Sequence, residues 1–232
     1  VLRCLCFGVV MNRCCNLRFC RHMYSFCIVI WLVPGRIGDV LMLDSFVIFC
    51  VRVLCCIVFA LCEECSQSPV PGAIHNVGAV PVLVDIDENY HIDCDDLDAK
   101  AKVSGAKVLL LSHMRGHIAD MDRVVEICNV YNICLIEDCA HTMGAKWRGI
   151  RSGNFGTVAT FSTQTYKHMN SGEGGFLTTN NPEIAARAVV SSGSYMLYGR
   201  HGAIPAEEVF QKIRLHSPNY SGRMDQMRAA ML

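Results

Sequence analysis

After residue 70, short apolar runs that are typical of buried strands alternate with longer segments that are typical of helices. Three short apolar runs have the length and composition of buried strands, at residues 80–86, 107–112 and 133–136. Asp93 predicts the start of a helix that runs to about Val103 and stops at Gly105, and Asp120 predicts the start of another. This alternation predicts right-handed βαβ units, and hence an α/β fold with a mainly parallel sheet and flanking helices.

The remaining elements are predicted by weaker signals. The second helix has an apolar stripe at helical spacing, formed by Val124, Val125, Ile127, Cys128 and Tyr131. Apolar runs at 157–161 and 175–178 predict two more strands. Asn181-Pro182-Glu183 predicts a helix start, because Asn is a favoured cap and Pro fits the first turn. A last helix is expected from near Arg223 to Leu232.

The first 68 residues lack this pattern and carry most of the cysteines. Eleven of the 15 cysteines lie before residue 66, separated mainly by apolar residues rather than by the polar turns of a disulfide scaffold. One Cys-x-x-Cys pair, Cys62 with Cys65, has no second pair to complete a zinc site. We interpret residues 1–68 as a hydrophobic, cysteine-rich leader and residues 69–232 as a partial large domain that is incomplete at both ends.

A membrane anchor is an alternative interpretation of this leader. The run from Phe46 to Cys62 is apolar except for Arg52. Its length is at the short limit for a spanning helix, and a central Arg costs about 2.5–3.5 kcal/mol on insertion scales. A mis-set reading frame or start site explains the leader better, so we expect a cytoplasmic protein without membrane contact.

The charge balance excludes some function classes. The 232 residues include 21 basic and 21 acidic side chains, which gives a formal net charge of zero. A general nucleic-acid binder would need an excess of basic residues to neutralise phosphates. Hydrophobic residues make up 52% of the chain, which is too many for a disordered protein.

Four polar residues are expected at the carboxyl ends of the strands, where open α/β sheets bind ligands. Asp138 follows the third strand, and His141 comes three residues later. Ser162 follows the 157–161 run, and Lys167 lies in the polar loop after it. A carboxylate, an imidazole and an amine suit a cofactor with an aldehyde, a cationic ring nitrogen and a phosphate. Pyridoxal phosphate has all three groups.

Several motifs occur in a defined order around these residues. They are Gly78 through Val82, His113 through Gly116, Glu137-Asp138-Cys139-Ala140-His141, Gly153-Asn154-Phe155-Gly156, Phe161-Ser162-Thr163-Gln164, Gly172-Glu173-Gly174-Gly175 and Arg223-Met224. Together they resemble the DegT/DnrJ/EryC1/StrS family of sugar aminotransferases, which have the aspartate-aminotransferase-like fold. The resemblance covers roughly residues 69–232. The Ser162-Thr163-Gln164 segment and the glycine-rich segment at residues 171–175 are also similar in sequence to the family branch that acts on keto-cyclitols.

The resemblance implies a role for each of the four polar residues. Lys167 would bond to the cofactor aldehyde and then move the reacting proton, and Asp138 would pair with the ring nitrogen. His141 would stack on the ring, and Ser162 would donate to the phosphate. Without the resemblance, these would be a solvated lysine, a strand-ending aspartate, a half-buried imidazole and a turn serine.

The resemblance also implies the reaction and the assembly. The implied reaction is a pyridoxal-phosphate-dependent transamination of a nucleotide-linked keto-sugar or a keto-cyclitol, with an amino acid such as glutamate or glutamine as donor. The implied assembly is a homodimer. Lys167 stands where dehydratase relatives carry His. The family's phosphate-binding Ser-Gly-Thr loop is not found in residues 1–68, so a truncated or non-catalytic remnant that binds the cofactor weakly is the alternative.

Two other patterns point to chemistry less strongly. His113 and His117 have the spacing of a zinc pair on a helix, but Gly116 predicts a loop and no third ligand follows, so we expect no metal. The glycines of residues 172–175 lack the flanking strand and helix of a dinucleotide fingerprint. We expect them to form a tight turn beside the cofactor loop.

Overall fold

The computed structural model describes residues 6–8, 27–31, 40–41, 59–63, 73–74, 77–194, 206–220 and 222–232. In these residues one large sheet has the strand order β12-β1-β2-β3-β11-β10-β7-β6-β4-β5. The strands are β1 (Cys6–Gly8), β2 (Cys27–Trp31), β3 (Val40–Leu41), β4 (Phe59–Glu63), β5 (Val80–Val84), β6 (Val108–Ser112), β7 (Cys134–Asp138), β10 (Val158–Ser162), β11 (Gly175–Thr179) and β12 (Gly222–Arg223). β8 (Lys146–Trp147) and β9 (Ile150–Arg151) form a separate hairpin.

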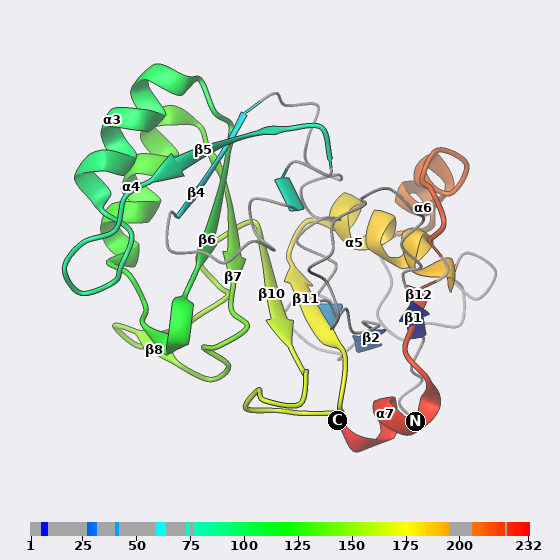
Figure 1. Ribbon diagram of the computed structural model, residues 1–232. Coiled ribbons are helices and arrows are strands. Elements are labelled where there is room, and N and C mark those ends of the chain that lie inside the picture. The colour runs from blue at the N-terminus through cyan, green and yellow to red at the C-terminus, as the bar shows by residue number, and fades with distance from the viewer. Residues whose placement is uncertain are drawn as a thin grey trace, which may run out of the picture.

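The half of the sheet that runs from β10 to the β5 edge is parallel, as the sequence predicted. From β5 through β4, β6 and β7 to β10, every neighbouring pair of strands is parallel. β11 pairs antiparallel with β10, and the pairs that extend the sheet beyond β11 are antiparallel as well. Parallel pairing brings the carboxyl ends of β6, β7 and β10 to one edge (Figure 1).

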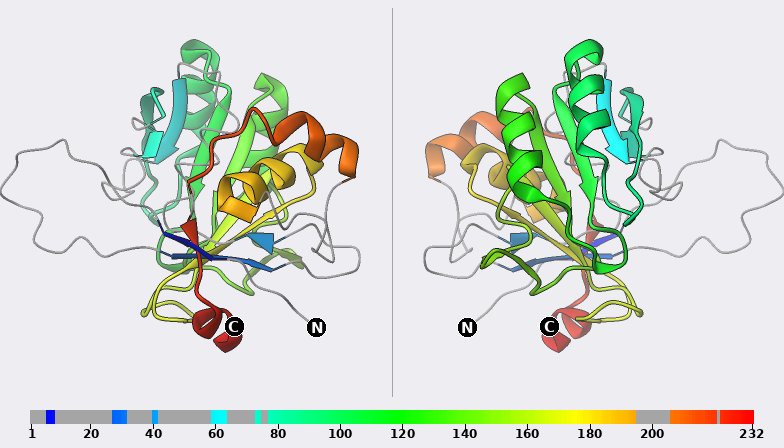
Figure 2. Two further views of the ribbon diagram at one scale, coloured as in Figure 1. Left: turned by 90° about the vertical axis from the view of Figure 1, so that its right-hand side faces the viewer. Right: turned by 90° about the vertical axis from the view of Figure 1, so that its left-hand side faces the viewer.

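The helices lie on two sides of this sheet. Figure 2 shows α3 (Cys94–Ser104) and α4 (Met121–Tyr131) on the opposite side of the molecule from α5 (Pro182–Val189) and α6 (Glu207–Ile213). The short helix α7 (Gln226–Met231) lies beside the loop between β10 and β11 (Figure 1). A 3₁₀ turn, η1 (Met114–Gly116), follows β6, and a π-helical turn, η2 (Val190–Ser194), follows α5.

The predicted helix ends are confirmed by their caps. The Asp93 carboxylate accepts hydrogen bonds from the first backbone N–H groups of α3, and Gly105 ends that helix with a left-handed φ of 65°. Asp120 and Asn181 cap α4 and α5 in the same way as Asp93. These caps satisfy N–H groups that have no partner inside the helix, which is why the signals could be recognised locally.

The main core lies between the sheet and the α3–α4 pair. Leu109, Leu111 and Leu135 lie on one face of β6 and β7 and pack with buried α3 and α4 residues such as Leu97 and Val124. Their strand neighbours, including Leu110 and Ile136, are also fully buried on the other face. Burial on both faces explains why these strands are continuous apolar runs rather than alternating ones.

One expectation changes with the structure. The last helix begins at Gln226 and not near Arg223, because the Asp225 side chain accepts the Arg228 N–H and so fixes the helix start. Arg223 instead belongs to the short strand β12.

The proposed membrane run falls mostly outside the described residues. Its last four residues, 59–62, belong to strand β4, which is paired with β5 and β6. Among the residues described, no helix combines the length and apolar character needed to cross a membrane. The division of the chain at residue 68 stays a prediction.

Candidate functional site

Four side chains surround the carboxyl end of β7, and we call them the edge site: Ser112, Asp138, His141 and Lys167. Ser112 and Asp138 are the last residues of β6 and β7 and are register partners in the parallel pair. His141 follows in the turn after β7, and Lys167 comes from the loop after β10. The strand ends explain why residues separated by up to 55 positions converge here, because parallel strands bring equivalent ends together.

The Asp138 carboxylate is oriented by two donors. The Ser112 hydroxyl donates to Oδ2 over 2.8 Å, and the Ala140 N–H donates to Oδ1 over 3.1 Å. Each carboxylate oxygen can accept about two hydrogen bonds, so acceptor capacity remains on both. Asp138 is only half-buried, so a ligand that approaches from the surface can reach the acceptor sites that remain.

Both ring nitrogens of His141 have contacts. The backbone N–H of Arg115, in η1, donates to Nδ1 over 2.9 Å. On the other side of the ring, Nε2 lies 2.6 Å from the Lys167 Nζ. Burial lowers the pKa of His141 from its usual value of 6.5, and the basic Lys167 side chain adds to this effect, while Asp138 opposes it.

The loop that carries Lys167 is closed by its own backbone. Thr163 N–H donates to Gly174 O over 2.7 Å, Ser171 N–H to Thr163 O over 2.9 Å, and Thr165 N–H to Gly172 O over 3.0 Å. Positive φ angles at Gly172 and Gly174 confirm the expected tight turn. Ser162, at the end of β10, is buried, and its hydroxyl accepts the Gln164 N–H over 3.3 Å.

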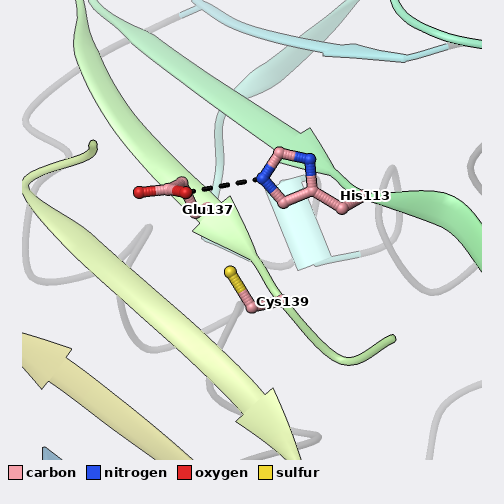
Figure 3. Close-up of side chains that lie close together, drawn as sticks. All are labelled: His113, Glu137 and Cys139. Carbon is pink, nitrogen blue, oxygen red and sulfur yellow. Dashed lines mark hydrogen bonds and ion pairs between the residues drawn. The ribbon is translucent and has the colours of Figure 1, made fainter. Parts of the chain in front are cut away.

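A second carboxylate on β7 was missed by the sequence analysis. Glu137 is fully buried, and it accepts three backbone hydrogen bonds, from Gly153 (2.8 Å), Phe155 (2.8 Å) and Gly156 (2.6 Å). The His113 Nε2 lies 3.4 Å from the same carboxylate (Figure 3). We call Glu137, His113 and the turn at residues 153–156 the anchor cluster. The signal available in the sequence was an acid that directly follows the apolar run of residues 133–136.

The anchor cluster depends on the close approach of its turn to the sheet. A Cβ atom on Gly156 would lie 2.6 Å from the Leu135 carbonyl oxygen, which is closer than such atoms approach each other. The turn can therefore reach Glu137 only with glycine at this position. The Gly-x-x-Gly motif thus has a structural function, which is to deliver backbone N–H groups to a buried carboxylate.

His113, Glu137 and Cys139 lie near enough together to be tested as a metal site. The Glu137 oxygens are already occupied by backbone donors. The second His113 nitrogen, Nδ1, has no hydrogen-bond partner and points away from Cys139 (Figure 3), whereas metal-bound histidines normally donate from their second nitrogen. His117 is not part of this group, and its ring lies 5.8 Å from that of His91. The donor set therefore fits a hydrogen-bonded anchor better than a metal ion.

The structure brings three of the four predicted site residues into direct proximity. Lys167 contacts His141, and Asp138 influences His141 electrostatically. Ser162 lies on the neighbouring strand end at the same edge. Ser112 was not predicted, although its place at the end of an apolar strand parallel to that of Asp138 was visible in the sequence.

Comparison with known proteins identifies the family. Residues 69–232 match the DegT/DnrJ/EryC1/StrS aminotransferase family. The chain belongs to this family. Because the match covers more than half of the chain, the resemblance found in the motifs is confirmed, and so is the expected fold class.

Two family members illustrate the likeness. A putative L-glutamine:3-amino-2,3-dideoxy-scyllo-inosose aminotransferase of Micromonospora echinospora is 43% identical over 121 residues, which are 52% of this chain and 28% of that protein. GDP-perosamine synthase of Caulobacter vibrioides is 39% identical over 120 residues, or 51% of this chain and 32% of that enzyme. The chain thus matches about a third or less of the length of either relative.

A solved structure has the same fold. It is GDP-4-keto-6-deoxymannose-3-dehydratase with a trapped PLP-glutamate geminal diamine. The TM-score is 0.70 and the identity 22%, over 84% of this chain and 55% of the other. At this identity the likeness concerns the fold, and the chemistry must be argued from the residues of this chain.

Proposed function

We propose that this member of the DegT/DnrJ/EryC1/StrS family uses pyridoxal phosphate to transfer an amino group from glutamate or glutamine to a nucleotide-linked keto-sugar or a keto-cyclitol. The observation that carries the proposal is the edge site, where the Lys167 amine, the His141 ring and the oriented Asp138 carboxylate meet. The relatives' names, which include an inosose aminotransferase and a perosamine synthase, support both substrate classes.

The edge site has the donors and acceptors that pyridoxal phosphate requires. Asp138 offers an acceptor for a protonated ring nitrogen, and Lys167 offers an amine that forms no ion pair within the part of the chain that the structure describes. When bound, the cofactor supplies an aldehyde for the amino group and a ring that accepts the electrons released at the substrate carbon. The solved relative named with a PLP-glutamate adduct is consistent with this choice.

Asp138 holds the ring nitrogen in its protonated form. A carboxylate favours the charged form of a neighbouring cation, and the effect grows when the carboxylate is fixed and partly shielded from water. The Ser112 hydroxyl and the Ala140 N–H provide that fixed orientation. Asp138 therefore contributes a preorganised charge at no further ordering cost.

Lys167 moves the reacting proton. Its Nζ is a basic atom on the closed loop, and in each half-reaction an amine there would move a proton between the substrate carbon that bears the nitrogen and the aldehyde-derived carbon of the cofactor. The three backbone hydrogen bonds of the loop limit how far Nζ can drift between the two transfers. Ser162, on the adjacent strand end, would donate its hydroxyl hydrogen to the phosphate, and the His141 ring would pack against the cofactor ring.

The function is tested by cofactor binding and by trapping. Pyridoxal phosphate added to the chain should give a visible absorption band, and borohydride should fix the cofactor covalently on the Lys167 peptide. Lys167→Ala should remove both signals, while Lys146→Ala, at an exposed lysine of β8, should leave them unchanged. Covalent cofactor on Lys146, or a band that persists in Lys167→Ala, would contradict the proposal.

A homodimer is the assembly we propose. Tyr166, next to Lys167, is 90% exposed, and Met227 and Met231 of α7 are also largely exposed. Helix α7 lies close to the loop that carries Tyr166, since a Cβ on Gly172 would lie 3.8 Å from the Arg228 side chain in α7. Sedimentation equilibrium should give twice the chain mass, and Tyr166→Glu should shift the mass towards that of the monomer. The cytoplasmic location stays a prediction.

A further inference from the structure

The motif at residues 113–116 has no part in the proposed function, although it forms the turn η1 beside the edge site. This turn contacts His141 at two points. The Arg115 backbone N–H donates to the ring nitrogen Nδ1 over 2.9 Å. Gly116 lies against the main chain of the same histidine, since a Cβ atom on Gly116 would be 3.2 Å from the His141 carbonyl oxygen. One contact holds the ring, and the other holds the backbone that carries it.

The Arg115 N–H is available to His141 because the turn uses its following amides internally. The N–H groups of the next two residues donate to carbonyl oxygens within the turn, over 3.2 and 3.1 Å. Arg115 itself has a left-handed backbone, with φ 52° and ψ 21°, which an arginine seldom adopts. Such a conformation persists only where the surrounding structure imposes it, and the contacts with His141 are part of that structure.

The start of the turn is fixed to the sheet. The His113 N–H donates to the Asp138 carbonyl oxygen over 3.1 Å, which continues the pairing of β6 and β7 by one residue. The His113 side chain is fully buried, and its Nε2 lies 3.4 Å from the Glu137 carboxylate of the anchor cluster. The turn is therefore held at its start by buried groups, and it contacts His141 with the residues that follow.

We propose that the turn η1 holds the His141 ring in a fixed orientation at the edge site, with Arg115 as the positioning residue that acts through its backbone amide. The inference rests on the proposed function, in which this ring would pack against the cofactor ring. The torsion that sets the plane of a histidine ring has broad preferences, and His141 is only half-buried, so a directed hydrogen bond is needed to fix the plane. Burial lowers the pKa of His141, and an uncharged ring keeps a nitrogen that can accept the Arg115 N–H.

Two glycine substitutions separate the contact with His141 from backbone strain. Gly116→Ala and Gly149→Ala each place a side chain on a residue with a φ of 88°, so both strain the backbone to a similar degree. Only the Cβ on Gly116 meets His141, because nothing lies within 4 Å of a Cβ on Gly149. With pyridoxal phosphate bound, Gly116→Ala should weaken the visible circular dichroism of the cofactor and slow the half-reaction with the amino donor about tenfold, as expected for a misplaced active-site group. Gly149→Ala should match the wild type in both.

A second pair of substitutions acts at Arg115 and decides the matter if Gly116→Ala does not fold. Arg115→Asn and Arg115→Val both remove the guanidinium and keep the backbone N–H. Asparagine tolerates a left-handed backbone, whereas the β-branched valine opposes it. In the chain without cofactor, NMR detects the hydrogen bond as a ¹⁵N–¹⁵N coupling between the amide nitrogen of residue 115 and Nδ1 of His141. The coupling should be present in the wild type and in Arg115→Asn, and it should be lost in Arg115→Val.

The two measurements distinguish this inference from the function on which it rests. Absence of the coupling in the wild type, or its survival in Arg115→Val, would overturn the inference. So would a Gly116→Ala protein that equals Gly149→Ala in circular dichroism and rate, while the wild-type cofactor band would still support the proposed function. A wild-type chain that shows the coupling but gives no cofactor band would instead refute the proposed function and leave the hold on His141 standing.

Discussion

On the face of β7 that packs toward α3 and α4, the Glu137 carboxylate is fully buried and accepts three backbone N–H groups, with His113 beside it. On the opposite face the next residue, Asp138, is half-buried and accepts one hydroxyl and one N–H. Two adjacent acids thus differ in how much acceptor capacity the protein leaves unused. In the anchor cluster, backbone N–H groups take up the acceptor capacity of the Glu137 carboxylate. In the edge site, part of the acceptor capacity of Asp138 is left for a ligand.

The difference shows why burial alone does not identify a functional acid. A buried carboxylate is tolerated when the protein supplies its hydrogen bonds, and those bonds leave it no partner to gain from a ligand. An oriented but incompletely satisfied carboxylate is available to bind. The following predictions test this distinction, in order of decreasing effect.

Removal of the anchor carboxylate should have the largest effect. Glu137→Ala leaves three backbone N–H groups, one buried and two partly buried, without their acceptor, and we expect a loss of about 4 kcal/mol in the free energy of unfolding. Urea denaturation followed by circular dichroism measures this. Glu183→Ala, which removes an exposed carboxylate paired with Arg187, should cost less than about 1 kcal/mol. Similar losses in both variants would refute the anchor role.

Removal of the edge-site charge should affect catalysis rather than folding. Asp138→Asn retains the shape of the side chain and an oxygen that accepts the Ala140 N–H, and the Ser112 hydroxyl can rotate to accept from the new NH2 group, so the free energy of unfolding should change by less than about 1 kcal/mol. The half-reaction with the amino donor should slow about a hundredfold, because a positioned charge is worth roughly that much in an active site. Stopped-flow absorbance measures the rate. An unchanged rate would show that Asp138 has only a structural role at the end of β7.

Removal of the Ser112 hydroxyl should have a smaller effect. Ser112→Ala deletes one donor to Asp138, but water can replace it because Asp138 is only half-buried. We expect cofactor affinity to fall about fivefold, which corresponds to one ordinary hydrogen bond. Ser104→Ala, at the end of α3, is the matched serine control in a fluorescence titration. Equal affinity in Ser112→Ala and the wild type would show that the Ser112 hydroxyl is not needed to orient Asp138.

The smallest expected effect is a change of stability with pH. Because the folded protein lowers the pKa of His141, the unfolded chain binds a proton there more readily, so His141 makes the protein less stable as pH falls below about 6.5. The urea midpoint should drop less between pH 7.5 and 5.5 in His141→Asn than in the wild type. His117→Asn should show the wild-type drop. Parallel drops in all three proteins would mean that His141 does not contribute.

The sequence predicted the elements whose signals are local. Asp93, Asp120 and Asn181 cap helices within their own segments, so their effect could be recognised without the fold. The convergence of Asp138, His141 and Lys167 could also be predicted, because the βαβ pattern places strand ends at one edge.

Other features depend on distant partners. Glu137 receives backbone N–H groups from residues 16 to 19 positions later, and a backbone donor has no side-chain signature. The position of β4 between β5 and β6 is another case, because no local pattern shows which strands are neighbours. The hydrogen bond from the Arg115 amide to His141 is a further case, because it depends on the direction that the turn after β6 gives to this amide.

The closed loop at residues 163–174 has a consequence for protein engineering. Its two ends continue from Ser162 and Gly175, which are paired directly across β10 and β11, and its own backbone hydrogen bonds complete the closure. A segment with fixed, adjacent ends and internal bonding can be exchanged as one cassette. Loops from other family members can therefore be grafted between the same two residues, and the grafts would change the surroundings of the amine while the sheet stays as it is.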